Sequence, residues 1–167
     1  MMDELLEKLI GLITGEKQLY GSLLTVLQDE KAAVTGAGLE ALNRSVKEKE
    51  TVLLKIRILE EQRTNMLSQV AERLGLQAEN LTLARLAREI PEPYAGQVRA
   101  CRSSLLSLTQ SIQELNNSNR HLFRRSLELV KGSINLLINL RAPYPIYCQS
   151  GRLESAMASG RVLSGNV

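Results

Sequence analysis

The longest pattern in the chain is one apolar stripe that extends from Tyr94 to Leu140 without an intervening proline. Its positions follow one another in alternating steps of four and three residues, which places them on one face of an α-helix. The stripe consists of Tyr94, Val98, Cys101, Leu105, Leu108, Ile112, Leu115, Asn119, Leu122, Ser126, Leu129, Ser133, Leu136 and Leu140. Such a helix would be roughly 70 Å long at 1.5 Å per residue, which is more than a compact domain needs. The pattern therefore predicts a long helix that packs along other helices.

Two earlier stretches repeat this spacing and predict two more long helices, over about Asp3–Thr35 and Leu39–Leu74. Glu16 is a polar exception on the first stripe, and Glu60 and Arg63 are polar positions on the second. Because Glu60 and Arg63 are three residues apart on one predicted helix, we expect them to pair with each other.

Glycines and prolines mark the connections between these helices. The Gly-Ala-Gly segment at 36–38 predicts a hairpin connection, and Gly75 fits the left-handed position just past a helix end. Asn80 is predicted to cap a short helix over Leu81–Ile90, which the Pro-Glu-Pro segment at 91–93 ends.

These elements predict an all-α protein, namely an elongated antiparallel helical bundle of three long helices and one short connecting helix. The bundle domain is expected to cover residues 1–142. Pro143 and Pro145 prevent the long helix from continuing, and small residues dominate the segment that follows. Residues 143–167 are therefore predicted to form a flexible tail.

Composition and charge exclude several classes of partner. The net charge is only +3, and the cluster of Arg120, Arg124 and Arg125 lacks the aromatic residues that stack on bases. We interpret this cluster as a solvent-exposed helix face and expect no nucleic-acid partner.

The start of the chain lacks a basic signal-peptide region, and no apolar run reaches the ~18 residues of a membrane span. A cytoplasmic protein without membrane insertion is predicted.

The sequence lacks the residue patterns that support catalysis or metal binding. Its two cysteines, Cys101 and Cys148, do not form a CxxC motif, and its one histidine, His121, has no titratable partner of matching spacing. No glycine-rich phosphate loop is present. We therefore expect a binding protein with no cofactor, no metal and no catalytic residues.

The predicted long helix contains a polar interruption, Asn116–Asn119, followed by a broad apolar surface. Asn119 lies on the stripe itself, where it either sets the register between helices or faces a cleft in which a partner docks. Beyond it, Leu122 to Leu140 form a stripe wider than one neighbouring helix covers. Either a partner covers this surface or the protein self-associates into a homo-oligomer.

A series of short motifs accompanies these helices along the chain. It consists of Leu23-Leu24, Glu30, Lys47-Glu48-Lys49, Leu59-Glu60-x-x-Arg63, Leu81-Thr82, Leu115–Leu122, Ser126–Val130 and Tyr147-x-x-x-Gly151. In this order and on these helices, the series resembles the FlgN-type flagellar export chaperones, from the start of the chain to about Gly151. The glycine-rich segment at 36–38 departs from that family, and the residues after Gly151 match nothing in it.

The resemblance implies a cytoplasmic chaperone of the flagellar type III export system. Such proteins bind the helical ends of hook-associated proteins, prevent their premature assembly and deliver them to the export gate. Cargo recognition lies toward the C-terminal end in the family. The corresponding partner-binding residues in this chain are Asn119, Leu122, Phe123, Ser126, Leu129, Val130, Tyr144 and Tyr147. The two tyrosines either dock a partner or pack against the end of the bundle.

Two alternative functions stay open on the sequence alone. One is a structural coiled-coil or adaptor protein, although the interruptions at Gly36, Gly75 and Pro91 disfavour a continuous rod. The other is a type III secretion chaperone with a different cargo.

Overall fold

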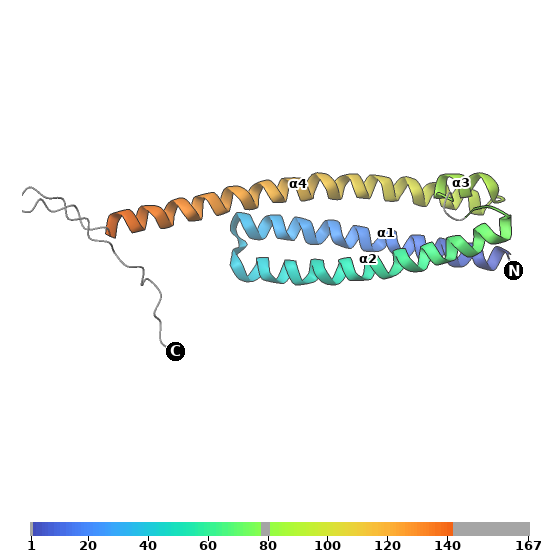
Figure 1. The fold of residues 1–167 in the computed structure, drawn as a ribbon, viewed down its shortest axis with the longest axis horizontal. Helices are drawn as coiled ribbons and strands as arrows, with labels where there is room; N and C mark the ends of the chain where they lie inside the picture. The colour runs from blue at the N-terminus through green and yellow to red at the C-terminus, as the bar shows by residue number, and fades with distance from the viewer. Residues whose placement is uncertain (1, 78–80, 142–167) are drawn as a thin grey trace, which may run out of the picture. The chain divides into compact units, whose positions relative to one another are not determined.

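The computed structural model describes residues 2–77 and 81–141, apart from the side chains of Ala37 and Arg141. The described residues are helical except for short connections, so the prediction of an all-α bundle is confirmed (Figure 1). The elements in chain order are α1 (Met2–Ala32), a short π-helical turn η1 (Ala33–Ala37), α2 (Gly38–Leu74), α3 (Leu83–Glu89) and α4 (Tyr94–Arg141).

The chain divides into two units, Met1–Phe123 and Arg124–Val167. The first contains α1, η1, α2, α3 and the part of α4 that ends at Phe123. The described part of the second is the rest of α4, from Arg124 to Arg141. The predicted change from bundle to tail after residue 142 lies outside the described residues and stays a prediction.

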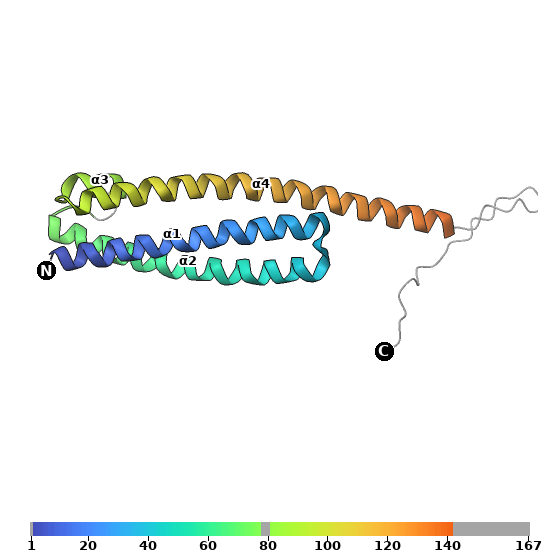
Figure 2. The same cartoon turned by 180° about the vertical axis from the view of Figure 1, so that it is seen from behind.

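Within the first unit, α1 and α2 form an antiparallel hairpin, and α4 runs beside it in the direction of α1 (Figure 1 and Figure 2). The hairpin connection lies at the predicted glycines. Gly38 has φ 88° and ψ 174°, a conformation in which a Cβ atom would clash with the backbone. Gly75 has φ 67° just after α2, which confirms its predicted role at the helix end.

Replacing Gly38 by alanine is expected to destabilise the protein by about 1–3 kcal/mol, because only glycine adopts this backbone conformation without strain. Gly21→Ala is the matched control. Gly21 lies inside α1, and a Cβ atom there would meet nothing within 4 Å. This control should be neutral or stabilising by up to about 1 kcal/mol. Urea denaturation measures both, and equal effects would contradict the assigned role of Gly38.

The short helix begins later than the sequence suggested, and its cap is Thr82 and not Asn80. The Thr82 hydroxyl accepts a hydrogen bond from the backbone N–H of Arg85 at 3.2 Å. Leu81 is buried in the core, so it fixes the chain just before the helix and leaves Thr82 in the extended conformation of an N-cap. Asn80 itself lies outside the described residues.

The core of the first unit consists of two separate apolar clusters. The larger one joins α1, α2, α3 and the start of α4 through residues such as Leu9, Val70, Leu86 and Val98. The smaller one is built on Leu23, Leu27 and Ile56, and side chains of α4 pack against it. The α1 positions between the two clusters carry Glu16, which is buried although it is charged.

Candidate partner-binding site

The candidate site is the apolar surface of α4 in the second unit, which we call the distal face. Its members share high exposure, between 50% and 73% of each side chain's accessible surface. They are Leu127, Leu129, Val130, Ile134, Leu136, Leu137, Ile138 and Leu140. Exposed apolar side chains that occur singly are ordinary, whereas a contiguous set along one helix marks an interaction surface.

The same helix buries its stripe in the first unit. Ala95 and Val98 lie inside the larger core cluster, Cys101 and Leu105 pack against it, and Ile112 and Leu115 pack against the smaller one. From residue 127 to residue 140, by contrast, every side chain of α4 is exposed. One helix therefore has a covered segment and an uncovered segment of the same apolar pattern.

The structure separates the eight predicted contact residues into groups. Leu129 and Val130 belong to the distal face, whereas Leu122, Phe123 and Ser126 are half-buried. Asn119 is buried. Tyr144 and Tyr147 lie outside the described residues, so their role stays a prediction.

Asn119 joins α4 to the hairpin by hydrogen bonds. Its Nδ2 atom donates to the backbone oxygen of Leu27 at 2.8 Å and to Oε2 of Glu30 at 3.1 Å. The other carboxylate oxygen of Glu30, Oε1, accepts from the ammonium of Lys49 on α2. A single carboxylate thus contacts both other long helices. The Nδ2 group of Asn119 is paired in this alignment of the helices, whereas its buried Oδ1 atom has no hydrogen-bond partner. The two donated bonds favour the register-setting interpretation of Asn119.

A second polar layer lies between the two core clusters and corrects one prediction. Glu60 and Arg63 do not pair with each other, because each reaches across to α1. The guanidinium Nε of Arg63 donates to both carboxylate oxygens of Glu16, at 2.8 and 2.9 Å. The hydroxyl of Tyr20 donates to Oε1 of Glu60 at 2.7 Å. The spacing of Glu60 and Arg63 along α2 allows them to meet, but each instead binds a less solvated side chain of α1.

The electrostatic effects in this layer come mainly from burial. Burial raises the pKa of Glu16 above its ordinary value, and the opposing effect of Arg63 is smaller. Burial, together with the Glu60 carboxylate, raises the pKa of Tyr20 to about 12. Both groups contribute to the packing between α1 and α2.

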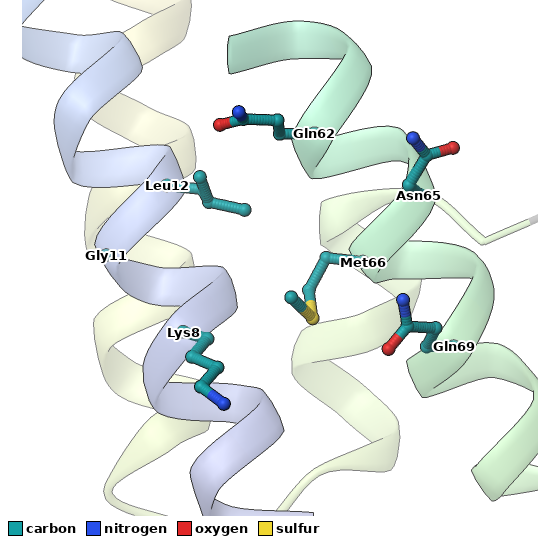
Figure 3. A pocket seen from close by; sticks show the side chains of 7 residues that line it. All are labelled: Lys8, Gly11, Leu12, Gln62, Asn65, Met66 and Gln69. Atoms are coloured by element: carbon teal, nitrogen blue, oxygen red, sulfur yellow. The ribbon is translucent and has the colours of Figure 1, made fainter.

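An open groove of about 460 Å³ lies between α1 and α2 (Figure 3). It is lined by Lys8, Gly11, Leu12, Gln62, Asn65, Met66 and Gln69. These are amide, aliphatic and thioether groups with one ammonium, which pairs with Glu4 at 2.8 Å. The groove contains no acid–base pair and no nucleophile. Sequence reasoning missed this groove, and the small residue in its lining is Gly11.

Among the described residues, no group of three or more histidine, cysteine, aspartate or glutamate side chains is arranged to hold a metal ion. Of the helices described, none combines the length and apolar character needed to cross a bilayer.

The family model described as FlgN protein matches residues 1–155 of this chain. No curated protein and no solved structure matches it. The matched range covers the hairpin, the short helix and all of α4, including the distal face. The chain therefore belongs to the FlgN family of flagellar export chaperones.

Proposed function

We propose that this chaperone binds the helical ends of hook-associated flagellar proteins in the cytoplasm, prevents their premature assembly and delivers them to the export gate. Family membership supports the general role, and the distal face of α4 is the observation that supports binding of a helical cargo. An amphipathic helix binds another protein by laying its apolar side into an apolar surface. The distal face offers such a surface along a helix of 48 residues.

The partner-binding residues in this proposal are the members of the distal face, together with the half-buried Leu122, Phe123 and Ser126 at its beginning. Leu129 and Val130 were already predicted as contacts, and Ile134, Leu136, Leu137, Ile138 and Leu140 extend the surface by more than two turns. Asn119, also predicted as a contact, is buried and donates hydrogen bonds to α1. Tyr144 and Tyr147 are proposed as anchors for the cargo or for the export gate.

Co-expression with individual hook-associated proteins tests the proposal. We expect one or more of them to co-purify with the chaperone as a stable complex, and to lose this binding when their terminal helices are deleted. A flagellar protein of another class, such as a rod or hook subunit, serves as the control cargo. Selective capture of the control, or capture that does not depend on terminal helices, would favour a type III chaperone with a different cargo.

A further inference from the structure

The distal face is wider than a surface for a single helix. At 100° per residue, the apolar positions from Leu127 to Leu140 cover an arc of roughly 200°, about twice the width of a stripe that faces one neighbour. Two strips make up this arc. The first strip consists of Leu129, Leu136 and Leu140, and the second consists of Leu127, Val130, Ile134, Leu137 and Ile138. The small residues Ser126 and Ser133 lie between the strips.

The first part of α4 shows how the apolar side chains of this helix are buried. In the first unit, α4 contributes Ala95 and Val98 to a core cluster to which α1 and α2 both contribute. Side chains of two long helices thus belong to the same core cluster as the start of the α4 stripe. The distal face continues this stripe along α4 and is broader, yet its side chains are exposed. A covering partner that restores the same packing has to supply two helices.

Basic residues border both strips. By helical position, Arg125 lies beside the first strip, and Lys131 and Arg124 lie beside the second. None of these three forms an ion pair within the described part of the chain. Glu128 is the only carboxylate between residues 120 and 140, and it lies on the polar side between them. Charge complementarity therefore calls for carboxylates along the outer edges of the partner.

We propose that the distal face binds a pair of amphipathic helices, one on each strip, whose outer edges carry acidic residues. This inference rests on the proposed function and specifies the form of the cargo segment. The two cargo helices complete a three-helix core around the end of α4, and their carboxylates pair with Arg125 on one side and with Arg124 and Lys131 on the other.

The two strips are tested separately by titrating a purified hook-associated protein into the full chain and following the heat released. Leu129→Ala with Leu136→Ala removes the first strip, and Val130→Ala with Ile134→Ala removes the second. Each double variant is expected to weaken binding at least about tenfold, because truncated anchors in a buried interface have effects of this size. The matched control is Leu53→Ala with Leu54→Ala, two exposed leucines of α2, and it should leave the affinity unchanged.

The acidic edges are tested with charge reversals. Arg125→Glu and Lys131→Glu should each slow association and weaken binding by about fivefold at low salt, with a smaller effect at high salt. Lys47→Glu is the control, because it changes the net charge equally at an exposed position on α2. Equal effects of all three reversals would show general charge attraction only and would overturn the assignment of acidic edges.

Other outcomes overturn the inference in distinguishable ways. If only one strip matters, the cargo binds as a single helix, and the proposed function stands without the inference. If the unaltered chain binds no hook-associated protein, both are wrong. If sedimentation shows that the unaltered chain is a dimer and that both strip variants are monomers, the distal face binds a second copy of the chain. If truncation at residue 141 makes cargo binding tighter, the last residues of the chain itself compete with cargo for the distal face.

Discussion

Replacing Leu136 by aspartate is expected to reduce cargo binding at least a hundredfold and to leave the bundle intact. Leu136 is 60% exposed in the free protein, so the charge is solvated there and the fold tolerates it. In the complex, the same carboxylate would be buried among apolar side chains without a partner. An unpaired buried charge costs several kcal/mol, which corresponds to more than about a hundredfold in the dissociation constant.

The control for this prediction lies on the same helix. Leu106 is 55% exposed in the first unit and lies outside the apolar stripe of α4, so Leu106→Asp introduces an equal charge in a similar environment. It should bind cargo like the unaltered protein. Calorimetric titration measures the affinities, and circular dichroism verifies that helix content is retained. Equal affinities for the two variants would show that the distal face does not contact cargo.

Replacing Arg63 by methionine is expected to lower the free energy of unfolding by about 3 kcal/mol at neutral pH. The methionine fills a similar volume, but it leaves the carboxylate of Glu16 buried and unpaired, since that side chain is only 2% exposed. Removing one member of a buried pair typically costs 3–5 kcal/mol. We expect the lower end because Arg63 is 25% exposed, so water can partly replace it.

The loss of stability caused by Arg63→Met should be smaller at acidic pH than at neutral pH. The pKa of Glu16 is raised in the folded protein, so the folded state keeps the Glu16 proton to a higher pH than the unfolded state does. The stability that comes from this bound proton is lost as the pH rises through the folded-state pKa. Without Arg63 the pKa rises further. The difference in stability between variant and parent should therefore shrink on acidification toward about pH 4, near the unperturbed range of glutamate.

Urea denaturation at both pH values measures this difference. Lys8→Met is the control, because Lys8 pairs with Glu4 on the exposed surface of α1 and its loss should change stability little. A stability difference for Arg63→Met that is the same at both pH values would show that Glu16 is not its cause.

The helices could be predicted from the sequence because their apolar spacing is a property of each segment alone. The long helix was expected over Tyr94–Leu140 and is found over Tyr94–Arg141. The glycines of the hairpin connection were equally clear, since few residues other than glycine adopt the backbone angles of Gly38. Helix spacing and glycine backbone angles depend only on residues that are neighbours in the sequence, so both could be predicted from it.

The pairing of polar residues between helices could not be predicted. Glu60 and Arg63 were expected to bind each other, but the register of α2 against α1 brings Tyr20 and Glu16 within reach. For the same reason, the sequence alone did not show that Asn119 lies opposite Leu27 and Glu30 of α1. The stripe width did indicate an uncovered surface after Leu122, although the predicted contact residues on α4 ended at Val130.

The exposed segment of α4 also has a consequence for the strength of a complex. Gly132, Asn135 and Asn139 are poor helix formers, and a segment of this length without packing partners is close to the helix–coil midpoint in water. A partner that docks there must also hold the helix in its folded form, and the ordering entropy reduces the net affinity. A complex formed on such a segment is therefore weaker than one formed on a rigid surface of equal area.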